Sequence, residues 1–199
     1  AEEILTAIRR ATKLPFTVKM RLGWDDASRN AVEIARMAEA VGVDAVAVHG
    51  RTREQFYSGN ADYAAIAEVK RAVKIPVIVS GDIRRPADLV RALDITSADA
   101  VMIGRGAQGN PWIFPQLIHW LHTGEELPPP TLTERAQVIL RHLDLLVGYK
   151  GEYIGIREMR KHAAWYTRSL KGSAELRERF NRAASREEFV EILHTAWNI

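Results

Sequence analysis

Several short apolar runs in the first half of the chain end in residues that suit an anionic ligand. The clearest case is Gly104-Arg105-Gly106, which follows the run Ala100–Ile103. The glycines leave backbone N–H groups accessible, and the guanidinium between them can donate two hydrogen bonds to a phosphate. The continuation to Gly109 also matches the dinucleotide pattern GxGxxG, but Pro111 and the lack of a following strand argue against that fold. We therefore expect a phosphate site here, with a structural glycine turn as the alternative.

Three earlier runs end in a similar way. His49-Gly50-Arg51-Thr52-Arg53 follows the run 44–48, and Ser80-Gly81-Asp82 follows the run 76–79. A histidine can donate to a carbonyl or ring nitrogen, and the arginines suit a polyanion. A lone histidine is often structural, but this setting favours a role in a pocket. Strand alternation points Lys19 into the interior, where its charge needs an anionic or electron-rich partner, either a cofactor or a carboxylate from elsewhere.

These polar ends belong to a regular alternation of strands and helices. We expect strands at 15–21, 44–48, 76–79 and 100–103, and helices at 1–13, 29–41, 63–72 and 86–93. Nearly continuous apolar strands indicate a parallel sheet, and a (β/α) barrel carries its site at the carboxyl ends of such strands. A complete barrel needs eight strands and about 250 residues. With four units, an abrupt start and a helical tail, residues 1–122 are predicted to be the C-terminal half of a (β/α)8 TIM barrel.

The remainder of the chain, residues 123–199, predicts a separate all-α helical bundle. The amphipathic segment 113–122 leads into a loop at 124–130 that ends in three prolines, which is typical of a domain boundary. Helices are expected at 131–149, 154–170, 174–183 and 185–197. Thr131 with Glu134, and Ser185 with Glu188, have capping-box spacing.

Composition places the chain among ordinary globular proteins, with 47% hydrophobic and 27% charged residues. No apolar run approaches the roughly 18–20 residues that span a membrane, and a cytoplasmic location is expected. The sequence contains 0 cysteines, which excludes disulfides and thiolate metal sites in this chain. The histidines of the helical segments lack ligand spacing, so no metal site is expected. A net charge of +3 does not by itself argue for nucleic acid.

Basic residues gather locally on the helix expected at 154–170. Its candidate RNA-binding residues are Arg157, Arg160 and Lys161, flanked by His162 and Trp165. A solvated charged face is the alternative. Arg51 and Arg53 are further RNA-binding candidates, at the barrel mouth.

Five motifs occur in order along nearly the whole chain: VKMRLGW, VHGRTR, SGDI, IGRGAQGNPWIF and RKHAAWY. Together they resemble the bacterial tRNA-dihydrouridine synthases, most closely the DusB type. The resemblance implies an FMN-dependent TIM barrel followed by a helical tRNA-binding domain. It also implies reduction of particular uridines in tRNA to 5,6-dihydrouridine, with NADPH as the reductant.

The same resemblance implies residue roles. Lys19 matches the lysine at the pyrimidine end of the flavin, and His49 matches the histidine of the flavin and substrate pocket. The flavin phosphate would be held by two segments, Ser80-Gly81-Asp82 and Gly104-Arg105. Ser80 stands where the family usually has Asn, a change that is mild if the phosphate is held by backbone groups and that weakens the site if it is held by the side chain.

The family's catalytic cysteine lies in the N-terminal half, so no catalytic residue is expected in this chain, which should be inactive alone. Its expected partners are tRNA and either the missing N-terminal half-barrel or a second copy joined through exposed sheet edges. Two other functions remain open: a non-catalytic RNA-binding fragment, or a phosphate-binding half-barrel for a small metabolite.

Overall fold

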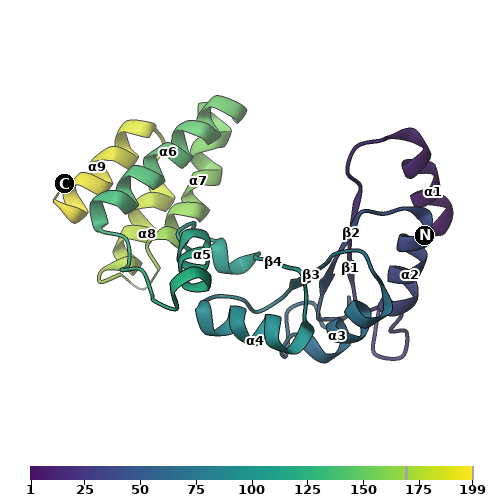
Figure 1. Cartoon of the computed structure of the whole chain (residues 1–199). Helices are drawn as coiled ribbons and strands as arrows, with labels where there is room; N and C mark the ends of the chain where they lie inside the picture. Colours follow the sequence, from purple (N-terminus) through teal and green to yellow (C-terminus); the bar gives the residue numbers. More distant parts are fainter. Residues whose placement is uncertain (169, 199) are drawn as a thin grey trace. The chain divides into compact units, whose positions relative to one another are not determined.

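The computed structural model describes residues 1–168 and 170–198, and its first part alternates helices with strands (Figure 1). In chain order these elements are α1 (Glu2–Ala11), β1 (Thr17–Arg21), α2 (Ala31–Val41), β2 (Ala45–His49), α3 (Tyr63–Ala72), β3 (Val77–Ser80), α4 (Pro86–Thr96) and β4 (Ala100–Met102). Neighbouring helices along the chain pack on one another, α1 on α2, α2 on α3 and α3 on α4. This is the arrangement of a barrel wall.

The four strands form one parallel sheet in the order β1-β2-β3-β4. Its register aligns Arg21 with His49, His49 with Ser80, and Ser80 with Met102. The carboxyl ends of all four strands therefore lie along one edge of the sheet. This alignment of the strand ends explains how polar residues that are far apart in sequence come to line one site.

Burial is deepest in the two central strands. Val46 and Val48 of β2 and Val77 and Val79 of β3 are all completely buried. The edge strand β1 alternates between exposed and half-buried residues instead. Central parallel strands are covered on both faces, which is why they read as continuous apolar runs in the sequence.

The second part is helical and packs around its own core. It contains α5 (Ile113–Thr123), α6 (Leu132–Lys150), α7 (Glu152–Tyr166), α8 (Ser173–Arg182) and α9 (Arg186–Trp197). Ile139, Leu143, Met159, Phe180 and Phe189 are completely buried in this core. The rings of the two phenylalanines stack with their centroids 5.1 Å apart.

The chain divides by its contacts into two compact units, Ala1–Gly106 and Ala107–Ile199. We call them the α/β unit and the helical unit. Segment 107–122 groups with the helices, whereas the sequence pattern predicted it as part of the barrel. Four parallel βα units followed by a helical bundle confirm the predicted fold class.

Most predicted element ends lie within three residues of the observed ones. Helix α2 begins at Ala31 rather than at residue 29, and its N-cap Asn30 makes no side-chain capping bond. Asp25, whose carboxylate could also cap this helix, instead accepts hydrogen bonds from the backbone N–H and the hydroxyl of Ser28. Helix α7 ends at Tyr166, four residues before its predicted end. Among the helices described, none is long and apolar enough to cross a membrane.

A close approach of α6 and α7 depends on Gly155. A Cβ at this position would lie 2.8 Å from the backbone nitrogen of Val147, whereas a Cβ at Gly148 would meet nothing within 4 Å. We therefore expect Gly155→Ala to lower the free energy of unfolding by about 1–3 kcal/mol through overpacking. Gly148→Ala, on the exposed surface of α6, should instead raise it by up to about 1 kcal/mol through helix propensity. Urea unfolding followed by circular dichroism measures both, and changes of the same sign would contradict the close approach.

Candidate functional site

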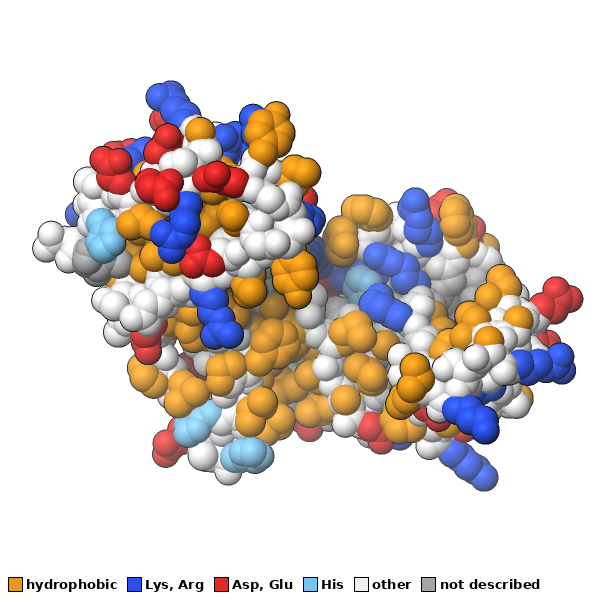
Figure 2. All heavy atoms as spheres, turned by 90° about the horizontal axis from the view of Figure 1, so that it is seen from above, with side chains coloured by type: hydrophobic (Ala, Val, Ile, Leu, Met, Phe, Trp, Pro, Cys, Tyr) orange, Lys and Arg blue, Asp and Glu red, His pale blue; other side chains and the backbone are white. Residues whose placement is uncertain are grey.

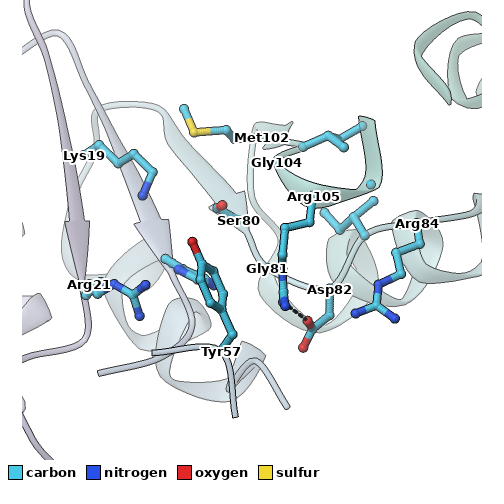
Figure 3. Close-up of a pocket in the computed structure, with 14 residues that line it drawn as sticks. Lys19, Arg21, Tyr57, Ser80, Gly81, Asp82, Arg84, Met102, Gly104 and Arg105 are labelled. Carbon is cyan, nitrogen blue, oxygen red and sulfur yellow. Dashed lines mark hydrogen bonds and ion pairs between the residues drawn. The ribbon is translucent and has the colours of Figure 1, made fainter. Parts of the chain in front are cut away.

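A pocket of about 260 Å³ lies at the carboxyl ends of the four strands (Figure 3). Every strand contributes to its lining, with Lys19 and Arg21 from β1, His49 from β2, Ser80 from β3 and Met102 from β4. The loops that follow add Tyr57, the segment Gly81–Arg84 and the segment Gly104–Gly106. All seven residues predicted to bind a cofactor thus line one cavity: Lys19, His49, Ser80, Gly81, Asp82, Gly104 and Arg105.

One side of this pocket is held by a buried ion pair. Arg51 is only 1% exposed, and its Nη2 donates to Oδ2 of Asp82 at 2.6 Å. The same guanidinium donates to the carbonyls of Ser58 and Gly59 at 2.9 and 2.6 Å. A buried charge is tolerated when it is paired and its donors are used, as here. Arg51 therefore ties the loop after β2 to the loop after β3.

The turn after β3 requires a glycine. Gly81 has φ +125°, and a Cβ there would lie 2.8 Å from Cβ of Ala61 and 3.0 Å from the ring of His49. The next residue, Asp82, is also left-handed, with φ 54°. Its carboxylate turns away from the pocket centre and accepts from the backbone N–H of Ala61 at 2.8 Å as well as from Arg51. The glycine thus lets the chain pass close to His49, and Asp82 fixes the turn.

Electrostatics keep His49 neutral. Burial, followed by the nearby charges of Arg21, Lys19 and Arg51, lowers the pKa of His49 from 6.5 to about 4. Nη1 of Arg51 lies 3.4 Å from Nε2 of His49. A guanidinium only donates, so Nε2 is the acceptor and the neutral ring carries its proton on Nδ1. At neutral pH this histidine is a hydrogen-bonding group and holds no positive charge.

Asp82 is the carboxylate of this pocket, and it remains ionised. Burial would raise the pKa of Asp82, but hydrogen bonds from Arg51 and from the N–H of Ala61 outweigh it and hold that pKa below its ordinary value. Its other oxygen lies 3.4 Å from Nη2 of Arg105, as the dashed line in Figure 3 marks. The negative charge is thus shared between two arginines.

The remaining lining suits an anion. The ammonium of Lys19 points toward the pocket (Figure 3), and among the described residues neither Lys19 nor Arg21 has a carboxylate partner. On the face of the α/β unit that Figure 2 shows, Lys and Arg side chains gather near its middle. A Cβ at Gly104 would meet nothing within 4 Å, so the backbone there is open to a close ligand. Uncompensated cations beside open backbone favour a phosphate-bearing ligand.

The predicted RNA-binding residues of the α/β unit differ in accessibility. Arg53 is exposed, and its guanidinium carbon lies 5.4 Å from the ring centroid of Trp24. Arg51 is buried in the ion pair described above, so an RNA strand has no access to its guanidinium in this structure. A run of charges in the sequence gives no sign of this difference.

In the helical unit the five candidates lie on α7. Arg157 and Lys161 are exposed, and the ammonium of Lys161 lies 5.2 Å from the ring centroid of Trp165. The ring of His162 meets Trp165 edge-on at 5.1 Å. Arg160 is half-buried and donates through Nε and Nη2 to the carbonyl of Ala183 at the end of α8. Its guanidinium is therefore engaged in holding two helices together.

Half of the residues that line the pocket were not among the predicted site residues, and two of them make notable contacts. Tyr57 lies in the loop after β2, and the guanidinium carbon of Arg105 sits 4.3 Å from its ring centroid. Arg21 donates through Nη1 to the carbonyls of Thr52 and Phe56. Arg21 was recognisable as a basic strand end. Tyr57 carries no sequence signal, because its place depends on how the loop folds back.

Comparisons with known proteins identify a consistent set of relatives. The family model described as "Dihydrouridine synthase (Dus)" matches residues 1–198. A protein of Rickettsia bellii named "Probable tRNA-dihydrouridine synthase" is 51% identical over 177 residues, covering 89% of this chain and 54% of its own length. The "tRNA-dihydrouridine synthase B" of Pseudomonas aeruginosa is 48% identical over 180 residues, covering 90% and 54%. The protein of that name in Xanthomonas axonopodis pv. citri is 49% identical over 180 residues, also covering 90% and 54%. The chain thus spans about half the length of these relatives.

The low pKa of His49 can be measured directly. We expect an NMR titration of the ring to give a midpoint near pH 4, and Arg21→Gln to move it upward toward 6.5, because one repelling charge is removed. The unfolded chain binds this proton near pH 6.5, so the contribution of His49 to stability is lost as the pH falls from about 6.5 to about 4. A midpoint above 6 in the unmodified chain would contradict the buried, neutral histidine.

The ion pair beneath the pocket predicts a large effect on stability. Asp82→Asn leaves the guanidinium of Arg51 buried without a counter-charge, and we expect the free energy of unfolding to fall by about 3–5 kcal/mol. Asp26→Asn is the matched control, since Asp26 pairs with Arg29 at the exposed surface and its loss should change stability little. Denaturant unfolding of both variants makes the comparison. Equal effects would show that the Arg51–Asp82 pair does not hold the loops.

Proposed function

This chain belongs to the dihydrouridine synthase family, and we propose that it supplies the carboxyl-terminal part of a B-type (DusB) tRNA-dihydrouridine synthase. In this proposal the enzyme is an FMN-dependent oxidoreductase that reduces particular uridines of tRNA to 5,6-dihydrouridine with NADPH. The observation that supports it most strongly is the cationic pocket at the carboxyl ends of four barrel strands. That edge of a barrel is where such enzymes carry their site.

We assign the pocket residues roles toward FMN by their chemistry. The phosphate suits the open backbone at Gly104 and the guanidinium of Arg105, while Ser80 and Gly81 offer a hydroxyl and close backbone beside it. The carboxylate of Asp82 would repel a phosphate, so its part is to hold the turn and to orient Arg105. Lys19 can place its ammonium against an electron-rich carbonyl oxygen of the ring system. FMN supplies hydride transfer when it is bound.

His49 is assigned to the junction of cofactor and substrate. Its ring is neutral and hydrogen-bonded to Arg51, so it can orient a carbonyl or an amide group and cannot serve as a strong acid. A proton is also needed to complete the reduction of a uracil, and the sequence contains 0 cysteines to give it. We propose that this proton donor lies in another part of the enzyme and that the chain alone is inactive.

The edges of the sheet also support the proposal that another part of the enzyme completes this chain. Within the part of the chain that the structure describes, β1 and β4 each pair with one strand, so each presents a free edge. We propose that these edges meet the strands of a missing N-terminal half-barrel, with association of two copies as the other arrangement. The exposed cations Arg53, Arg157 and Lys161 would then contact the phosphates of tRNA. A tRNA substrate would place the protein in the cytoplasm.

A chimera tests the assignment. This chain should replace the matching 180 residues of the Pseudomonas aeruginosa synthase, to which it is 48% identical. We expect the purified chimera to bind FMN and to form dihydrouridine in tRNA with NADPH, while the chain alone forms none. A chimera that folds and binds FMN but leaves tRNA unmodified would contradict the proposal.

The proposed role of Arg105 in binding the FMN phosphate can be tested by a substitution in the same chimera. Arg105→Met should weaken FMN binding about tenfold or more, because a hydrogen bond to a charged group contributes roughly 1.5–3 kcal/mol. Arg36→Met, on the exposed surface of α2 and outside the pocket lining, is the control and should bind FMN normally. Fluorescence quenching of FMN measures both.

A further inference from the structure

An exposed group of one cation and two aromatic rings lies beside the pocket and has no role in the cofactor site. Trp24 is 62% exposed and Phe56 is 57% exposed. The guanidinium carbon of Arg53 lies 5.4 Å from the centroid of the Trp24 ring and 6.0 Å from that of Phe56. We call Trp24, Arg53 and Phe56 the aromatic platform.

The platform is fixed by backbone contacts between two loops. The N–H of Arg53 donates to the carbonyl of Gly23, and the N–H of Glu54 donates to the carbonyl of Trp24, both at 2.9 Å. These two hydrogen bonds hold the loop after β1, which carries Trp24, against the loop after β2, which carries Arg53. The rings are exposed but their backbones are held.

Phe56 has an unfavourable backbone conformation for its side chain. Its φ is 52°, in the left-handed region that bulky residues rarely occupy. Arg21 stabilises this conformation by donating through Nη1 to the carbonyls of Phe56 and Thr52 at 3.0 and 2.8 Å. The cost of the conformation is not recovered by burying the ring, since more than half of it stays in solvent. Strain that is held in place beside a pocket is typical of functional positions.

From this geometry we infer that the aromatic platform is a stacking site for an unpaired RNA base that neighbours the nucleotide in the pocket. Aromatic faces stack on any base, and a guanidinium beside them can meet the adjoining phosphate. The platform is continuous with the pocket wall, because the ring of Phe56 meets that of Tyr57 edge-on at 4.7 Å. The nearby carboxylates Asp25 and Asp26 are engaged by Ser28 and Arg29, which leaves the charge of Arg53 available.

This inference rests on the proposed function in one respect, that RNA reaches the pocket. The platform adds a contact that does not depend on the identity of the base. This contact discriminates single-stranded from paired RNA, because a base within a duplex has no free face to stack. The platform would therefore hold an RNA whose bases next to the target are already unstacked.

Substitutions that remove the ring but keep an apolar side chain test stacking. Trp24→Leu and Phe56→Leu in this chain should each weaken binding of a tRNA transcript about fivefold or more by fluorescence anisotropy, whereas Trp24→Phe should bind nearly normally. Arg53→Gln should lower the slope of log affinity against log salt by about one, and the leucine variants should leave that slope unchanged. Ile95→Ala, an exposed apolar position on α4, is the control.

Phe56→Gly separates a binding role from a structural one. Glycine adopts a positive φ without strain, so this variant should unfold at a midpoint no lower than that of the unmodified chain while binding RNA more weakly. A lowered midpoint with unchanged RNA affinity would overturn the inference. If all variants bind tRNA as the unmodified chain does, the platform is refuted and the proposed function stands. If the unmodified chain binds no RNA, both the platform and the proposed RNA contacts of this chain fail.

Discussion

The guanidinium of Arg51 is the point on which the pocket depends. It is nearly inaccessible to solvent, so its charge must be balanced and its donors satisfied within the protein. Asp82 provides the counter-charge, and two loop carbonyls take the other donors. Because Arg51 follows β2 and Asp82 follows β3, the pair fixes the spacing of two loops that the sheet alone would leave free. The left-handed turn at Gly81 brings that loop close to the ring of His49, which the register of β2 with β3 places at the strand end.

Much of this fold could be predicted from the sequence, because its signals are local. Central strands of a parallel sheet are apolar on both faces, and capping residues such as Thr131 and Ser185 mark the helix starts they were expected to mark. The start of α2 could not be predicted in the same way. Asp25 and Ser28 have the chemistry of helix caps but bond to each other, and only the structure shows which of two local hydrogen bonds forms.

The residues that line the site could be predicted because the carboxyl ends of parallel strands lie along one edge of the sheet. Polar residues directly after four parallel strands had to meet, and those assigned to the cofactor line one cavity. The separate roles of Arg51 and Arg53 were not predictable, since both belong to one basic run. Their difference is set by Asp82, which is 31 positions from Arg51 and pairs with the guanidinium of Arg51, whereas that of Arg53 stays exposed. Gly109 is similar: it completes a phosphate-binding pattern in the sequence, yet its left-handed backbone lies against that of Trp165 inside the helical unit.

The surroundings of His49 determine which chemistry this side chain can perform in the pocket. Burial and the same cations that attract an anionic ligand oppose protonation of the imidazole, so His49 is neutral at neutral pH. The pocket is therefore built to bind and orient, with a neutral histidine as a hydrogen-bonding group. In the proposed reduction, the proton therefore has to come from a group other than the imidazole of His49.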